Sequence, residues 1–325
     1  MKDSKRRLGR SDLLVSPIGL GCWQFSKGKG MTGRYWSALS DDEIAEIVAL
    51  SLEESVNWFD TAESYGGGES ERALARSLRR LDVDVDSVVI ATKWWPFLRT
   101  ARSITRTIDR RLEALDVPCI DLYQIHLPFS FSSVRAEMQS MAQLVKVGKV
   151  SAVGLSNYSA NGMKTASQEL EKHNINLVSN QVEFNLLNRN IETNGILKAA
   201  NELGITIIAY SPLAQGLLTG KYHSEPRRAR QLPSFRKIYN PVTSRRLKKS
   251  QPVIDVIRDL ANKYHVSPSQ IALNWVIHVH GERIVTIAGA SKASQAKDNA
   301  SALNFKLSEE DIARLDDVSL AYASS

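Results

Sequence analysis

The stretch that decides the fold is Trp58-Phe-Asp-Thr-Ala-Glu-Ser-Tyr-Gly-Gly-Gly-Glu-Ser-Glu71. A short apolar run ends in Asp60, Tyr65 follows in a loop with three glycines, and an amphipathic segment comes next. The order strand, loop, helix is typical of one unit of an alternating α/β fold, in which functional residues follow the ends of strands. Glycine tolerates tight turns, so the loop can bring Tyr65 back above Asp60.

The same unit recurs along the chain. Eight short apolar runs are candidate strands: Ile18–Trp23, Trp58–Asp60, Val88–Lys93, Ile120–Leu127, Val150–Ser156, Val178–Asn185, Thr206–Pro212 and Ile284–Gly289. Amphipathic segments lie between them, with helix starts predicted at Ser40 (a capping box with Glu43), Ser132 and Ser159, and a helix stop at Leu203-Gly204. Eight such units predict a single (β/α)8 TIM barrel domain over residues 1–325.

The remaining residues extend this barrel. Residues 6–16 predict an N-terminal β-hairpin across its bottom, residues 213–250 a long loop after strand 7, and Ser308 the cap of an extra C-terminal helix. Residues 28–33 match G-x-G-x-x-G, so a dinucleotide-binding Rossmann unit is the rival fold. Its spacing is unfavourable, because the helix cap Ser40 comes seven residues after Gly33 and Asp60 comes 27 after it, where about 20 are usual.

Composition is that of a globular protein without membrane spans. The chain is 43% hydrophobic and 24% charged, and no apolar run approaches the roughly 18 residues that cross a bilayer. The N-terminus has no apolar signal region, and Cys22 and Cys119 are the only cysteines, so we expect a reducing, cytoplasmic location. His265, His278 and His280 have no metal-ligand spacing, and we predict no metal.

The net charge of +7 is concentrated in one segment. Residues 221–250 hold ten Lys or Arg and one acid, Glu225. Three interpretations stay open: a lid that clamps cofactor phosphates, a solvated mobile flank, or a surface for nucleic acid or membrane. No nucleic-acid motif accompanies the segment, so we predict neither a nucleic-acid nor a membrane partner.

Polar residues end three successive predicted strands. Strand 2 ends in Asp60, strand 3 in Lys93 and strand 4 in His126, and Tyr65 lies just after Asp60. Because the carboxyl ends of barrel strands share one rim, these side chains are predicted to meet there. A lysine beside Tyr65 favours the phenolate and lowers the pKa, Asp60 compensates the lysine, and His126 can orient a carbonyl. This set suits a carbonyl reduction with Tyr65 as general acid.

The set of four polar residues resembles the catalytic tetrad of the aldo-keto reductase family. Its members are Asp60, Tyr65, Lys93 and His126, and the first two lie in the segment "FDTAESYG". The resemblance covers nearly the whole chain and is nearest to the branch of bacterial and plant reductases and potassium-channel β subunits. It implies NADPH/NADP⁺ as cofactor. The nicotinamide carboxamide would contact Ser156, Asn157 and Gln181, and the nicotinamide ring would stack on Tyr210. The pyrophosphate would lie along Ser211, Leu213, Gln215, Gly216 and Leu218, and the adenosine end would contact Gly289, Ser291, Lys292, Gln295 and Asn299. A lysine at a helix N-terminus also favours a 2′-phosphate on physical grounds.

The predicted substrate pocket is apolar and partly aromatic. Its residues lie at or just past strand ends: Trp23, Trp94, Trp95, Leu127 and Phe129. Trp58 lies inside a strand and is predicted to be part of the core. Leu127 and Phe129 depart from the Trp-containing segment that many relatives have after the histidine, and Ala288 stands where many have proline. These differences leave the substrate open. A pyridoxal-type aldehyde is one candidate.

Two functions follow. The first is NADPH-dependent reduction of an aldehyde or ketone by a monomer with a small-molecule substrate. The alternative is an NADP(H)-sensing regulatory module with little turnover, which could retain the same tetrad.

Overall fold

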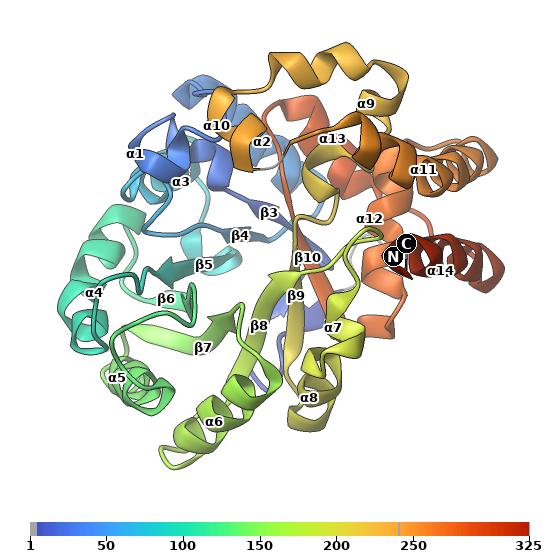
Figure 1. Ribbon diagram of the computed structural model, residues 1–325. Coiled ribbons are helices and arrows are strands. Elements are labelled where there is room, and N and C mark those ends of the chain that lie inside the picture. The colour runs from blue at the N-terminus through green and yellow to red at the C-terminus, as the bar shows by residue number, and fades with distance from the viewer. Residues whose placement is uncertain (1–4, 240, 325) are drawn as a thin grey trace.

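Eight parallel strands close into a barrel in the order β10-β3-β4-β5-β6-β7-β8-β9 (Figure 1). This computed structural model describes residues 5–239 and 241–324. The strands are β3 (Ile18–Gly21), β4 (Trp58–Asp60), β5 (Val89–Trp94), β6 (Ile120–Ile125), β7 (Val150–Ser156), β8 (Leu177–Glu183), β9 (Thr206–Tyr210) and β10 (Ile284–Gly289). Each overlaps one of the eight predicted runs, so the predicted TIM barrel is confirmed and the Rossmann alternative is wrong.

Helices form a ring around the barrel, as Figure 1 shows for α3 to α6. The longer ones are α2 (Asp41–Glu53), α3 (Glu69–Arg80), α4 (Arg102–Leu115), α5 (Val134–Lys146), α6 (Ala160–Glu171), α8 (Ile196–Leu203), α11 (Ser244–Tyr264), α12 (Pro268–His278), α13 (Ala293–Ser301) and α14 (Glu309–Ser324). Short helical turns are η1 (Trp23–Ser26), α1 (Gly30–Gly33), η2 (Val85–Ser87), α7 (Asn190–Thr193) and η5 (Gly281–Arg283).

The helix ends follow local chemistry. Ser40 and Glu43 form the predicted capping box of α2, Ser159 caps α6, and Gly204 ends α8 in the left-handed conformation. The prediction for Ser132 is wrong by one residue. Ser133 caps α5, and the Ser132 hydroxyl instead accepts a hydrogen bond from Ala101 N at 2.9 Å, which joins two loops at the rim.

The predicted N-terminal hairpin covers the bottom of the barrel. Strands β1 (Arg6–Arg7) and β2 (Leu14–Val15) pair antiparallel, and Leu8 and Val15 pack with Trp58 inside the barrel. The Trp58 indole donates to Ser16 O at 2.9 Å, which confirms its place in the core. A side chain on Gly19 would come within 2.2 Å of that indole, so glycine is required there.

The connection from β9 to α11 is not the continuous loop that the sequence suggested. It contains η3 (Ala214–Gly216), α9 (Lys221–Ser224), η4 (Pro226–Gln231) and α10 (Ser234–Tyr239), and α11 itself starts inside the predicted loop. The extra C-terminal helix α14 is confirmed, with Ser308 accepting from Asp311 N at 3.2 Å. Within residues 5–239 and 241–324, no helix is long and apolar enough to cross a membrane.

Candidate active site

A buried ion pair lies at the carboxyl ends of β4 and β5. The Lys93 ammonium donates to Asp60 Oδ1, to Thr61 O at 2.9 Å and to the Tyr65 hydroxyl at 3.5 Å. Lys93 is fully buried and Asp60 is 1% exposed. Burial disfavours the ammonium, but the charge of Asp60 and the contact with Tyr65 outweigh it, so the pKa of Lys93 lies above its ordinary value. Lys93 is therefore a charged group beside the tyrosine.

The glycine loop brings Tyr65 to this pair. Gly66, Gly67 and Gly68 all have positive φ, between 65° and 83°, a left-handed conformation that glycine adopts more readily than residues with a side chain. A side chain on Gly66 would also meet Ser26 O at 2.7 Å. The tight turn leads directly into α3, and Ser70 N donates back to Tyr65 O at 3.2 Å. The predicted tight turn, which brings Tyr65 back above Asp60, is confirmed.

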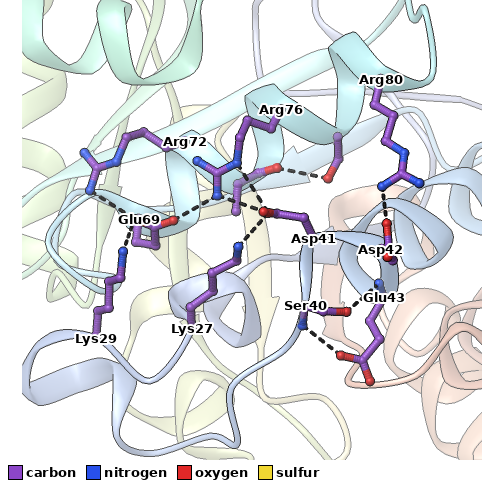
Figure 2. Close-up of polar contacts among 12 residues, drawn as sticks. Lys27, Lys29, Ser40, Asp41, Asp42, Glu43, Glu69, Arg72, Arg76 and Arg80 are labelled. Carbon is purple, nitrogen blue, oxygen red and sulfur yellow. Dashed lines mark hydrogen bonds and ion pairs between the residues drawn. The ribbon is translucent and has the colours of Figure 1, made fainter.

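A charge network fixes the segments on either side of this turn (Figure 2). Lys29 pairs with Glu69 at 2.9 Å and Lys27 with Asp41 at 2.6 Å, while Arg76 of α3 bridges both acids. The network thus ties the loop after β3 to the first turns of α2 and α3. Burial alone would raise the pKa of Glu69, but its hydrogen bonds to Lys29 and Arg76 lower that pKa from 4.5 to about 2.

We expect Glu69→Gln to lower the free energy of unfolding at pH 7 by roughly 1–3 kcal/mol, because a carboxylate that accepts several charged hydrogen bonds is lost. Since the folded pKa is depressed, the stabilisation is full above about pH 4.5 and is lost as the pH falls towards 2. Urea unfolding at pH 7 and pH 3 should show the gap between Glu69→Gln and wild type shrinking at pH 3.

The matched control is Asp42→Asn, which removes the exposed Arg80–Asp42 pair in the same view (Figure 2). For Asp42→Asn we expect the free energy of unfolding to change by about 0–1 kcal/mol, the usual contribution of an exposed ion pair. A loss in Asp42→Asn equal to that in Glu69→Gln would contradict a special role for Glu69.

Aromatic rings surround the Tyr65 hydroxyl. Tyr65 stacks on Trp23 at 5.8 Å between ring centroids and meets His126 edge-on at 5.6 Å. Trp95 also packs edge-on against His126, at 5.2 Å between ring centroids. The four rings leave the hydroxyl and the imidazole facing a common cavity, which suits a flat or apolar substrate.

The structure corrects one electrostatic expectation. Burial raises the pKa of Tyr65 above its ordinary value, and this effect outweighs the opposing influence of Lys93. The phenol therefore holds its proton at neutral pH. Burial, aided by Lys93, lowers the pKa of His126 well below its usual value, so the imidazole is neutral. Its Nδ1 lies 3.3 Å from the Ser64 hydroxyl.

A cavity of about 1360 Å³ runs from this cluster across the carboxyl ends of β7 to β10. It is lined by Asp60, Tyr65 and His126, by Trp23, Trp95 and Leu127 of the predicted substrate pocket, and by twelve of the predicted cofactor residues: Ser156, Asn157, Gln181, Tyr210, Ser211, Leu213, Gln215, Gly216, Gly289, Ser291, Gln295 and Asn299. One cavity thus joins the tetrad to nearly the whole predicted cofactor site.

The polar groups at its inner end are arranged around amides. The Asn157 side chain donates to His126 O at 3.2 Å and accepts from the Tyr210 hydroxyl at 3.0 Å. Gln181 donates to Asp60 Oδ2 at 2.8 Å, and Ser156 is 1% exposed. Asn157 itself has φ of 62°, a left-handed conformation that asparagine tolerates. These groups offer donors and acceptors that match a carboxamide.

The basic connection after β9 lines the other end of the cavity. In Figure 1 its helix α10 lies near α1 and α2. The Arg236 guanidinium donates to Gln215 O and lies 4.6 Å from the centroid of a Trp36 ring. Lys221, Arg246 and Lys249 also line the cavity. Among the interpretations of residues 221–250, this placement favours a basic cover for phosphates over a free flank.

Four predicted site residues lie elsewhere. Trp94 does not line the cavity: it is fully buried outside the barrel, where its indole donates to Ser103 of α4 at 3.1 Å. Phe129 is 67% exposed and lies outside the cavity wall. Leu218 is core, and Lys292 is exposed as the N-cap of α13 without lining the cavity. The pocket predictions for Trp94 and Phe129 are therefore corrected.

Several residues of the site were not predicted from the sequence. Gln124, inside the barrel on β6, donates to Asp60 Oδ2 at 3.1 Å, and a polar residue in an otherwise apolar strand was the available signal. Gln24 lines the cavity beside Gly289, and its buried Oε1 has no hydrogen-bond partner within residues 5–239 and 241–324. Trp36 and Arg236 had no local signal, because their contact joins distant loops. A buried amide oxygen facing the cavity fits a polar ligand there.

Comparison with known proteins agrees with this geometry. Residues 17–320 match the model of the Aldo/keto reductase family. An uncharacterized oxidoreductase of Mycobacterium tuberculosis is 36% identical over 95% of this chain and 90% of its own length, and the chloroplastic pyridoxal reductase of Arabidopsis thaliana is 31% identical over 94% and 83%. The solved structure of a glycerol dehydrogenase from Gluconobacter oxydans superposes with a TM-score of 0.84 at 25% identity, covering 100% of this chain and 98% of that one. The chain belongs to the aldo/keto reductase family and is an oxidoreductase of that family.

Proposed function

We propose that this protein reduces an aldehyde or ketone to an alcohol with NADPH, and that Tyr65 supplies the proton. The observation that carries the proposal is the Tyr65 hydroxyl, 3.5 Å from the buried Lys93 ammonium and facing a cavity with room for a dinucleotide. Tyr65 and His126 would bind the carbonyl oxygen from two sides, and the charge of Lys93 would stabilise the tyrosinate that remains after proton transfer.

The residues at the inner end of the cavity fit a nicotinamide. Ser156, Asn157 and Gln181 would bind its carboxamide, and the Tyr210 ring, held by its bond to Asn157, would pack against its face. The left-handed backbone at Ser211, Gln215 and Gly216 would follow the pyrophosphate under the basic cover. Bound in this way, NADPH would supply the hydride.

His126 would orient the substrate as a neutral donor. If Nδ1 accepts from Ser64, the proton is on Nε2, which remains free to donate to a carbonyl oxygen. Its low pKa keeps a second positive charge away from Lys93. Asp60 is fully engaged by Lys93, Gln124 and Gln181, so its role would be to position the lysine.

The aromatic wall favours a flat substrate. Trp23 and Trp95 flank the tetrad, and Trp36 lines the same cavity. We therefore propose an aldehyde on an aromatic ring, and pyridoxal, a substrate named for one relative, belongs in the test panel with a nitrobenzaldehyde. Cofactor binding without reduction of any carbonyl in that panel would favour the sensing module instead.

Titration of tryptophan fluorescence with NADPH and NADH tests the cofactor. We expect NADPH to bind roughly 10–100-fold more tightly. Lys292 is the N-cap of α13 and follows Ser291 of the cavity wall, so it would add one charged hydrogen bond to a 2′-phosphate, a contribution of about 1.5–3 kcal/mol. Lys292→Ala should lose this preference. Lys297→Ala, an exposed lysine further along α13, should keep it. Equal affinity for the two cofactors in wild type would contradict the role of Lys292.

A further inference from the structure

A second cavity, of about 350 Å³, lies on the outside of the barrel against α4. It shares no lining residue with the catalytic cavity. Its wall consists of four arginines, Arg99, Arg106, Arg110 and Arg111, with two hydroxyl side chains and a single carboxylate, Glu63. From this wall we propose that the cavity binds a small phosphorylated ligand, a phosphate monoester dianion.

The positive charge exceeds what the protein itself neutralises. Arg99 pairs with Glu63, and Arg111 pairs with Glu71 at 2.6 Å. Arg106 and Arg110 lie one turn apart on the same face of α4, and neither pairs with a carboxylate in residues 5–239 or 241–324. Like charges at this spacing destabilise a helix, so an anion between them would relieve the repulsion.

Buried donors point to the same ligand. Arg111 is 8% exposed, and its Nε has no hydrogen-bond partner in the part of the chain that the structure describes. The Tyr123 hydroxyl, which lies outside the lining of this cavity, is also buried and has no hydrogen-bond partner among the described residues. A buried donor normally has an acceptor, because leaving it unpaired is costly. An oxyanion in the cavity would provide the acceptor that Arg111 lacks.

Arg99 is held ready for such a ligand. Its Nε donates to the Ser103 hydroxyl at 3.0 Å and its Nη2 to Thr107 at 2.9 Å. Planar guanidinium groups bind phosphate through paired hydrogen bonds, and four of them with net positive charge favour a dianion over a single carboxylate. The volume lies in the range of small-molecule sites and exceeds the needs of a single inorganic ion. These facts favour a phosphomonoester.

The site touches the catalytic loop through Glu63. Glu63 Oε1 accepts from Trp95 N at 2.6 Å as well as from Arg99, and Trp95 packs against His126. The Arg99 guanidinium also lies 5.3 Å from the centroid of a Trp94 ring. A ligand that draws Arg99 away from Glu63 should therefore change the surroundings of two tryptophans, and so change their fluorescence.

Calorimetric titration of the full chain with phenyl phosphate, and with inorganic phosphate as the simpler probe, tests the proposal. We expect saturable binding accompanied by a change in tryptophan emission. The double variant Arg106→Gln/Arg110→Gln removes two exposed arginines without breaking an ion pair, so it should fold normally. We expect it to bind phenyl phosphate at least about tenfold more weakly, since two charged contacts are lost.

Two controls separate this site from others. Arg102→Gln removes an exposed arginine of α4 that does not line the cavity, and it should leave the affinity unchanged. Lys292→Gln changes the exposed lysine proposed to bind the 2′-phosphate of the cofactor, and it should also leave the affinity for phenyl phosphate unchanged. Wild-type affinity in Arg106→Gln/Arg110→Gln, or a loss in Lys292→Gln instead, would overturn the proposal. An equal loss in Arg102→Gln would show general attraction to a basic surface and would overturn it as well.

Discussion

Tyr65→Phe is expected to lower kcat for reduction of a nitrobenzaldehyde by about 10²–10⁴-fold, the usual contribution of a positioned general acid. Phenylalanine keeps the stacking on Trp23 and the edge contact with His126, so the cavity keeps its shape. What disappears is the hydroxyl that lies 3.5 Å from Lys93. Affinity for NADPH, followed by tryptophan fluorescence, should therefore change little while turnover falls.

A matched control is Tyr264→Phe. That hydroxyl bonds to Asp311 and Ser308, and none of these three residues lines the cavity, so its removal should leave kcat at the wild-type value. A wild-type rate in Tyr65→Phe would refute its role as proton donor. Loss of NADPH binding in Tyr65→Phe would refute the separation of cofactor binding from proton transfer.

The sequence could predict this tetrad because strand ends in a closed parallel barrel have only one place to meet. Asp60, Lys93 and His126 each follow an apolar run, and three adjacent strands carry them to one rim. The direction of the Tyr65 pKa could not be predicted in the same way. That direction depends on the balance of two effects: burial of the phenol raises its pKa, and the nearby charge of Lys93 lowers it. Neither the depth of burial nor the distance to Lys93 can be read from spacing along the chain.

Trp94 and Trp95 show a second limit of prediction from sequence, the face of the barrel on which a side chain lies. Neighbouring residues of a strand point to opposite faces, but the sequence does not say which face a given residue takes where the strand ends. In the barrel, Trp94 points outward to α4, and Trp95 reaches the cavity. Both are large and apolar, so hydrophobicity could not separate them.

The contacts of Gln124 and Gln181 with Asp60 show a third limit of prediction from sequence. Both glutamines lie inside strands, and no local pattern places them on the same carboxylate as Lys93. Closure of the barrel brings β6 and β8 close to Asp60 of β4. Gln124 and Gln181 therefore donate to the same oxygen, Asp60 Oδ2, although they follow Asp60 by 64 and 121 positions in the sequence. Contacts across a barrel interior depend on strand tilt and register, which no local pattern contains.

Asp60→Asn is expected to have the largest effect on stability, a loss of about 3–5 kcal/mol in the free energy of unfolding, because it leaves the Lys93 ammonium fully buried without a counter-charge. The amide also cannot replace the hydrogen bonds. Asp60 accepts from Lys93 on Oδ1 and from two glutamine amides on Oδ2, whereas asparagine has a single acceptor oxygen. The NH₂ group must then face a donor on one side. Urea unfolding at pH 7 measures the loss, and kcat should fall with it because Lys93 is no longer held beside Tyr65.

The double variant Asp60→Asn/Lys93→Met separates the two causes. If the uncompensated charge is the main cost, removing it should return most of the lost stability, to within roughly 1–2 kcal/mol of wild type, since well-packed apolar replacements of buried pairs are often tolerated. Activity should stay low, because the tyrosinate formed by proton transfer would have no cation beside it. Failure of the double variant to recover stability would assign the cost to the unpaired amides of Gln124 and Gln181 instead. Recovery of both stability and activity would contradict any catalytic role for Lys93, and would leave the ion pair as a structural feature of the barrel rim.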